Sequence, residues 1–375
     1  MNTFKRSPRA VLIITVLVFS AMVFVDHRIA WQWIYTHWLF DYHFGFMKRS
    51  LIGELLALAF GSGHVVPLET VRILSWIILI ANTALFANFL LTHAKSLRNQ
   101  AEKSPNLVLF ACFFLLAPVG LRNFAYDLGR FDQVSFLLLL TQWFNPPVFL
   151  TAVAAAIMVL VHENFIFILL PAILLVVYSR KGWVASLGVA SLAGFATLAV
   201  VFAGKPGAPI EQLWAYIQSK ANSPLDYNLR LLYWNLHDQL EVNKGIYADN
   251  LKYLPGFFFC FLWCLPLIAF YRKLETKSAT DKLAWLGVFV GYVGIFMLSD
   301  WARSISDLFL VLSFLILYFA KTSPELQQQI LNPSSRMRKA LIALILVSLV
   351  VPAGGVDIPR VYKFKELVER YFHTL

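Results

Sequence analysis

The sequence predicts an all-α membrane protein with many spanning helices. Of its 375 residues, 59% are hydrophobic and only 14% are charged, and the mean hydropathy is +0.66. Soluble domains carry about 25% charged residues. Apolar runs close to the ~20 residues needed to cross a hydrocarbon core recur along the whole chain. Because these runs are continuous rather than alternating, they do not fit a transmembrane β-barrel.

The first apolar run fixes the predicted orientation of the chain. Lys5, Arg6 and Arg9 precede the run 10–25, which places the N-terminus in the cytoplasm by the positive-inside rule. No small-residue cleavage site follows, so we expect an uncleaved anchor rather than a signal peptide. The next clean span is 73–92, and the basic residues after it indicate a return to the cytoplasm.

Residues 26–72 therefore form one outer loop. Its segment 51–60 is apolar but has only ten residues, and ten helical residues cover about 15 Å, half of the hydrocarbon core. We expect this segment to lie in the membrane interface. The aromatic residues expected beside it in the interface are Trp31, Trp33, Tyr35 and Trp38.

The rest of the chain continues as one transmembrane domain. A long outer loop covers 204–250, no separate soluble domain is evident, and the tail 357–375 is expected outside. The later spans are 107–121, 134–144, 148–161, 165–178, 183–203, 254–270, 283–298, 305–320 and 340–351. The total is about eleven crossings. Alternatively, 134–144 is re-entrant and 148–178 is one long tilted helix.

The net charge of +11 agrees with this layout. The predicted cytoplasmic segments hold the excess of Lys and Arg, whereas the outer segments mix acids and bases. The basic charge therefore reflects orientation and contact with anionic lipid rather than nucleic acid. We expect a multi-pass protein of the cytoplasmic (inner) membrane with its active site on the outer, periplasmic face.

The first polar cluster lies in the first outer loop and contains Asp41, Lys48 and Arg49. Charged groups near a membrane are costly and usually face a polar cavity. A carboxylate at Asp41 could deprotonate a hydroxyl nucleophile. The alternative is an interfacial loop whose cations reach toward water.

The second cluster lies between two apolar spans and is the densest of the chain. It contains Arg122, Asp127, Arg130 and Asp132 within eleven residues. Arg130 could bind a phosphate, with Asp127 or Asp132 orienting it or a sugar hydroxyl. The alternative is a set of ion pairs that closes a short turn.

Two further clusters lie at predicted outer turns. His162 and Glu163 interrupt an apolar run and suit proton transfer, although a second histidine of a zinc protease motif is missing. Asp300, Trp301 and Arg303 form the other cluster, with Arg303 as a phosphate ligand and Trp301 as a surface for a sugar ring. Either cluster could instead be a hydrogen-bonded turn.

An uncleaved first span, a large first outer loop with an acidic residue and about ten further spans resemble the GT-C glycosyltransferases. The resemblance implies transfer of a sugar from a polyprenyl-phosphate donor, with inversion. It also implies that Asp41 is the catalytic base and that basic residues of the outer loops hold the lipid phosphate. Arg130 and Arg303 match best by position, with Lys48, Arg49 and Arg122 as further donor-binding candidates. The pair of acidic residues common in that loop is absent here, where Asp41-Tyr42-His43 stands.

The partners implied by this resemblance are a polyprenyl-phosphate-linked sugar, the bilayer, and a glycan, lipid or protein acceptor. No cofactor is certain and no metal ligands are assigned, although a divalent cation is compatible with the family. The substrate-orienting candidates are Asp127, Asp132, His162, Glu163, Asp300 and Trp301. Two other functions stay open, namely a polysaccharide polymerase or ligase and a transporter or flippase of a lipid-linked saccharide. The glycosyltransferase hypothesis predicts that four side chains converge on one cavity, namely Asp41, Arg130, Glu163 and Arg303.

Overall fold

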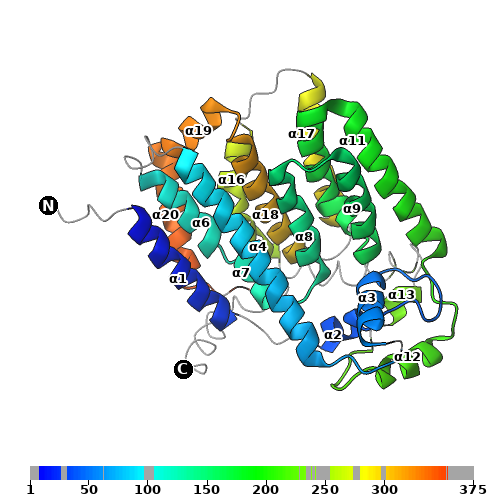
Figure 1. The fold of residues 1–375 in the computed structure, drawn as a ribbon. Helices are drawn as coiled ribbons and strands as arrows, with labels where there is room; N and C mark the ends of the chain where they lie inside the picture. Colours follow the sequence, from blue (N-terminus) through cyan, green and yellow to red (C-terminus); the bar gives the residue numbers. More distant parts are fainter. Residues whose placement is uncertain are drawn as a thin grey trace.

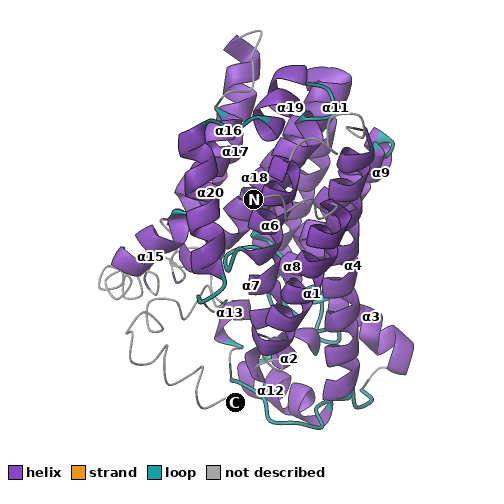
Figure 2. Ribbon diagram, turned by 90° about the vertical axis from the view of Figure 1, so that its left-hand side faces the viewer, coloured by secondary structure: helices purple, strands orange, loops and turns teal. Residues whose placement is uncertain are grey.

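The computed structural model describes residues 8–26, 32–61, 63–96, 105–227, 229–233, 238, 241, 254–272, 279–296, 301–351 and 353. In these segments every regular element is a helix, apart from an isolated parallel bridge between Val66 and Ala221 (Figure 2). The predicted all-α class is confirmed. The expected tail 357–375 and Trp31 lie outside the described residues.

Figure 1 shows the arrangement of the helices. In chain order they are α1 (Pro8–Asp26), α2 (Gln32–Trp38), α3 (Leu51–Phe60), α4 (Leu68–Ser96), α6 (Pro105–Leu116), α7 (Leu121–Tyr126), α8 (Phe131–Thr141), η1 (Gln142–Phe144), α9 (Val148–Val161), α10 (Phe165–Ile168), α11 (Leu170–Ala203), α12 (Ile210–Ser219), α13 (Arg230–Tyr233), α15 (Leu254–Phe261), α16 (Cys264–Tyr271), α17 (Ala279–Phe296), α18 (Trp301–Phe319), α19 (Pro324–Leu331) and α20 (Ser335–Ser348).

Several described helices are long and apolar enough to cross a membrane. The three that qualify by length and composition are Leu68–Thr92, Pro105–Tyr126 and Leu170–Ala203, and α18 with α19 is a fourth if that bent pair forms one span. Large apolar side chains such as Ile73 and Phe195 are exposed on them. Apolar surfaces of this kind indicate a membrane protein. The expected count of about eleven crossings is not confirmed.

Helix α18 lies inside the bundle, where α4, α15, α16 and α17 pack against it (Figure 1). Every residue from 304 to 320 is buried, as expected for a helix that is apolar on nearly all sides. At 1.5 Å per residue, the distance from Arg303 to Lys321 is roughly 27 Å, close to the thickness of a hydrocarbon core. The two ends of α18 therefore mark two ends of the bundle.

These two ends carry different groups. At one end, Lys321 lies over the ring of Trp143 at 3.6 Å and Arg180 donates to Asn145 at 3.2 Å. At the other end, Arg303 lines a pocket together with Trp33 and His37 of α2. Helices α3 and α12 lie beside α2 at this end (Figures 1 and 2). In the predicted topology, Arg180 follows the inward span 165–178 and Lys321 follows the inward span 305–320, so both are expected in the cytoplasm, whereas Arg303 lies at a predicted outer turn. The structure separates them in the same way, and the side that each end faces stays a prediction.

The segment 148–178 is broken, so the prediction of one long tilted helix is wrong. Helix α9 ends because His162 adopts an extended conformation, with φ −158° and ψ 113°, and the helix resumes at Phe165. Gly182, with φ +79°, then divides α11 into two arms. The Ser186 hydroxyl donates to the Leu174 carbonyl at 2.9 Å across this turn. The turn at Gly182 lies between the predicted segments 165–178 and 183–203, and whether each crosses the membrane stays a prediction.

Helix α3, in the segment predicted to be the first outer loop, has the predicted bounds 51–60. Leu55 and Leu58 are exposed on its surface, which suits a helix that lies in an interface. Gly53 allows α3 to approach the chain after α2, since a Cβ there would lie 1.8 Å from the Phe40 carbonyl oxygen. The bend of 116° between α18 and α19 was not predicted.

Candidate functional site

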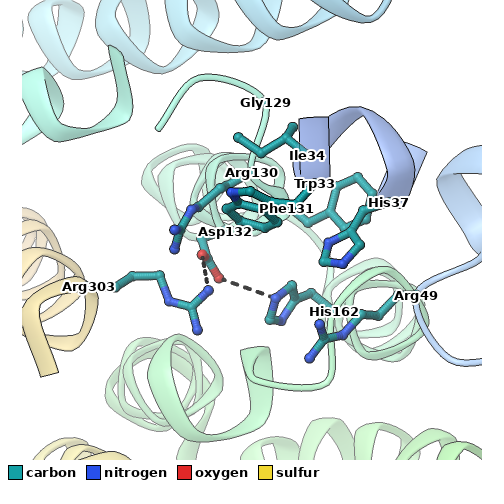
Figure 3. A pocket seen from close by; sticks show the side chains of 10 residues that line it. All are labelled: Trp33, Ile34, His37, Arg49, Gly129, Arg130, Phe131, Asp132, His162 and Arg303. Atoms are coloured by element: carbon teal, nitrogen blue, oxygen red, sulfur yellow. Dashed lines mark ion pairs between the residues drawn. The ribbon is translucent and has the colours of Figure 1, made fainter. Parts of the chain in front are cut away.

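A pocket opens at the end of the bundle marked by Arg303 (Figure 3). Its cavity volume is about 30 Å³, and the space reaches about 310 Å³ when the part that opens to solvent is included. Its lining consists of Trp33, Ile34, His37, Arg49, Gly129, Arg130, Phe131, Asp132, His162 and Arg303. Segments far apart in the sequence therefore meet here, as the clusters at predicted outer turns suggested.

Asp132 is the carboxylate among the residues that line this pocket. Arg303 lies 3.3 Å from its Oδ2 and His162 lies 4.0 Å from its Oδ1 (Figure 3). Burial raises the pKa of Asp132, but the positive charges around it lower the pKa by more, and Arg303 contributes most to this lowering. The net shift of the pKa is downward. Asp132 is therefore ionised at neutral pH.

Arg130 brings a second guanidinium to the pocket. Its Nε lies 3.4 Å from Asp127, and its guanidinium carbon lies 4.6 Å from the centre of the Trp33 ring. Stacking on an indole restricts an arginine while leaving its charge in place. Arg130 and Arg303 thus hold two positive charges beside Asp132, an arrangement that suits a phosphate.

Arg49 forms the third cationic part of the lining. Its Nε donates to both carboxylate oxygens of Glu163 at 2.9 Å, and its Nη2 donates to one of them as well. The pKa of Glu163 is raised by burial but lowered far more by the charge and hydrogen bonds of Arg49. Arg49 also has φ +63°, a strained conformation that residues other than glycine adopt rarely and often at functional sites.

Two histidines complete the lining, and both are neutral. Burial lowers the pKa of His162 to about 4, and Asp132 opposes this shift without reversing it. Burial also lowers the pKa of His37 well below its usual value, and Arg49 adds to the effect. Trp33 packs edge-on against His37, with ring centres 5.2 Å apart.

The local sequence explains how Asp132 reaches the pocket. Gly129 has φ +96°, and a Cβ there would lie 2.6 Å from the Ser75 hydroxyl oxygen. After the turn at Gly129, Arg130 is extended and forms the N-cap of helix α8, which begins at Phe131. Asp132 therefore lies in the first turn of α8, where the helix dipole stabilises a negative charge. Trp38 secures the turn by donating to the Gly129 carbonyl at 2.7 Å.

Asp41, the predicted catalytic base, does not line the pocket. It is buried, and its Oδ2 accepts from Lys220 at 2.6 Å and from Tyr216 at 2.7 Å. The backbone N–H of His43 donates to its Oδ1 at 3.0 Å. These contacts tie the segment after α2 to the end of α12, a structural role that the sequence did not reveal because Lys220 lies 179 residues further on.

Arg122, a predicted donor-binding residue, also lies outside the pocket lining. Its side chain is buried, and its Nε donates to Asp26 at 2.7 Å. Its remaining nitrogens donate to the carbonyls of Leu116, Ser348 and Val351. Arg122 therefore joins α1, α6 and the end of α20, and its ion pair reaches a distant helix instead of closing the short turn that the alternative for this cluster proposed.

The other predicted residues lie near the pocket or outside the described side chains. Glu163 pairs with Arg49, and Asp127 pairs with Arg130, so each carboxylate lies behind an arginine that lines the pocket. Lys48 precedes Arg49 without lining the pocket, and its pKa is lowered by burial, which the charge of Glu163 opposes. Asp300 and the side chain of Trp301 lie outside the described part of the structure.

His37 is the polar pocket residue that was not predicted from the sequence. It lies four residues after Trp33 and therefore on the same face of α2. That spacing was available in the sequence, but the segment was interpreted only as a set of interfacial aromatics. Ile34 and Phe131 were also missed, because isolated apolar residues carry no functional signal.

Metal binding has no support among the described residues, where no group of three His, Cys, Asp or Glu side chains could hold an ion. The compatibility of the site with a divalent cation stays untested. Comparisons of the chain with models of known protein families, with curated proteins and with solved structures gave no match.

Proposed function

We propose that this chain is a membrane glycosyltransferase that moves a sugar from a polyprenyl-phosphate donor to a hydroxyl acceptor. The observation that carries the proposal is the convergence of Arg130, Arg303 and Asp132 in one pocket at the end of an apolar bundle. A donor with a polyprenyl tail stays in the lipid, so its phosphate can be reached only at the surface of the membrane.

Arg130 and Arg303 are the proposed ligands of the donor phosphate. Guanidinium groups bind phosphate oxygens in pairs of parallel hydrogen bonds. As the bond from the anomeric carbon to the phosphate oxygen breaks, its electron pair stays on the phosphate. Fixed positive charge at that position stabilises the developing anion and lowers the barrier.

Asp132 replaces Asp41 as the proposed base, because its carboxylate faces the pocket whereas that of Asp41 is bound to Lys220. The acceptor oxygen forms a bond to the anomeric carbon and its proton passes to Asp132. Arg303 lowers the basicity of Asp132 in the empty pocket. A bound phosphate competes for Arg303 and so raises the pKa of Asp132 when the donor is present. Attack from the face opposite the phosphate inverts the configuration of the sugar.

A polysaccharide polymerase or ligase is the second candidate. It is favoured by the position of Asp41 outside the pocket and by the arginines and histidines that line it. Its donor would be a saccharide on a polyprenyl pyrophosphate. Against it, none of the described residues of the long loop 204–250, where a polymerase or ligase would place part of its site, lines the pocket.

The lipid product distinguishes these functions. The purified full chain in proteoliposomes is supplied with polyprenyl-phosphate hexoses or pentoses, or with pyrophosphate-linked oligosaccharides, together with hydroxyl acceptors. Mass spectrometry then identifies the lipid that is released. We expect polyprenyl phosphate, whereas release of polyprenyl pyrophosphate supports the polymerase or ligase. Movement of intact donor across the bilayer without either product supports a transporter.

Arginine variants test the phosphate site in the same assay. Arg303→Gln should lower transfer by about 10²- to 10³-fold, the range for removal of one preorganised charge donor. Arg336→Gln is the matched control, since Arg336 is exposed in the first turn of α20 and does not line the pocket. Equal activity of the Arg303→Gln variant and the control would remove Arg303 from the site.

A further inference from the structure

Helix α2 carries a buried histidine, His37, at the wall of the pocket. Its side chain lines the pocket and is 8% exposed. Its Nε2 has no hydrogen-bond partner among the described residues. In native proteins nearly all buried polar atoms have a hydrogen-bond partner. An atom without one at a pocket wall is therefore a candidate to hydrogen-bond a ligand.

The surroundings of His37 hold its ring in place. Trp33 packs edge-on against it, and Phe40 packs against it with ring centres 5.3 Å apart. Figure 3 shows the imidazole directed toward the space beside His162. The orientation of the nitrogen is therefore built by packing, and a ligand would meet a preorganised group.

The chemistry of the ligand group follows from the charges around it. Burial, and after it the positive charges of Arg49 and Arg130, lower the pKa of His37 and disfavour its protonation. A neutral imidazole nitrogen either donates or accepts a hydrogen bond, depending on the tautomer. A hydroxyl satisfies both cases because it donates and accepts, whereas an ionised phosphate only accepts. The phosphate itself is assigned to Arg130 and Arg303 in the proposed function, so His37 is left for a hydroxyl.

Trp33 connects the two parts of the pocket. Arg130 stacks over its ring, and His37 meets the same ring system edge-on. A ligand with a phosphate at Arg130 therefore places its adjoining part beside Trp33 and His37. In a glycosyl phosphate, that adjoining part is a ring bearing hydroxyl groups.

We propose that His37 Nε2 hydrogen-bonds a hydroxyl of the sugar whose phosphate is held by Arg130 and Arg303. This inference rests on the proposed function, because it takes the phosphate ligand to be a sugar phosphate. It makes His37 a specificity-determining residue that recognises the sugar rather than the lipid.

Binding of soluble probes tests this role apart from catalysis. Inorganic phosphate and a panel of hexose and pentose 1-phosphates are titrated calorimetrically into the full chain in nanodiscs. In the wild type, at least one sugar phosphate should bind more tightly than phosphate. His37→Phe keeps a ring but removes the nitrogen. This variant should lower the affinity for that sugar phosphate by about 2- to 12-fold, the contribution of one ordinary hydrogen bond. The affinity for inorganic phosphate should stay unchanged.

Two more variants separate recognition from folding. His37→Gln retains a polar group and should restore part of the lost affinity. His43→Phe is the matched control, because His43 is exposed, stacks on Tyr216 and does not line the pocket. It should leave both affinities at the wild-type level. Thermal unfolding of each variant shows whether the bundle stays intact.

The outcomes distinguish this inference from the proposed function. An equal loss of phosphate and sugar phosphate affinity in His37→Phe, or no loss of either, overturns the role of His37. The same holds if no sugar phosphate of the panel binds more tightly than phosphate. If phosphate fails to bind and Arg303→Gln changes nothing, the phosphate site and the proposed function fail together.

Discussion

The buried pair of Asp41 and Lys220 gives a prediction that separates structure from catalysis. Lys220 is fully buried, with 0% of its side chain exposed, and Asp41 retains 2%. Asp41→Asn removes the negative charge but keeps the size of the side chain. The variant therefore leaves an ammonium group in the interior without its counter-ion.

The magnitude follows from the contacts that remain. Removal of one partner from a buried ion pair costs about 3–5 kcal/mol. The amide oxygen of the variant still accepts from Lys220, and the Leu39 carbonyl still accepts from it at 2.9 Å. We therefore expect the low end, about 3 kcal/mol, or a hundredfold change in the ratio of folded to unfolded protein. Lys220→Met should show a comparable loss, since Asp41 is then buried without a cation.

A double-mutant cycle measures this coupling. Unfolding of the wild type, both single variants and Asp41→Asn/Lys220→Met is followed in detergent micelles. The double variant should be more stable than the sum of the single losses predicts, because it leaves no unpaired charge. Additive losses would contradict the pairing. Wild-type stability of Asp41→Asn together with loss of sugar transfer would refute our reasoning and return Asp41 to the role of base.

Three further predictions concern other parts of the site and its support. Gly129→Ala should destabilise the protein by about 1–3 kcal/mol in thermal unfolding, because φ +96° strains an alanine and its Cβ meets Ser75. Arg122→Met should lower the free energy of unfolding by about 3–5 kcal/mol, because Asp26 is then buried without its cation. The affinity for phosphate, measured by calorimetry, should stay unchanged. A weaker phosphate affinity would return Arg122 to the donor site. Since the pKa of His162 is about 4 rather than 6.5, its contribution to stability is complete above pH 6.5. That contribution is lost as the pH falls toward 4, by about 3 kcal/mol in total, and unfolding of His162→Gln should show a flatter pH profile.

The sequence predicted the hydrophobic elements well where one physical signal dominates. The run 73–92 lies within α4, and the segment 51–60 coincides with α3. Apolar length alone decides these assignments. The break at His162 was also visible, because polar residues interrupt an apolar run there. The turn of α18 into α19 was not visible, since no strong hydrophobic run marks so short a helix.

The site was predicted in part, for a reason rooted in topology. Arg130, Asp132, His162 and Arg303 follow or precede spans that end on the same predicted side, so their meeting could be expected. Sequence spacing does not reveal which of several charges on one side pair with each other. The partner of Asp41 lies 179 residues away.

The same limit explains the assignment of Arg122. Its partner Asp26 lies 96 residues earlier in the chain, and nothing in the local sequence identifies the pair. Arg122 and Arg130 look alike as phosphate ligands in the sequence. Only the packing of α1, α6 and α20 shows that one of them is buried in a structural contact.

The most direct test of our central claim is the rate at which Asp132→Asn releases polyprenyl phosphate from a polyprenyl-phosphate sugar in the presence of acceptor. The rate is compared with the wild type at equal amounts of folded protein, as judged by thermal unfolding. We predict a fall of about 10²- to 10⁴-fold, the usual contribution of a general base. A folded Asp132→Asn variant that transfers sugar at the wild-type rate would contradict the account.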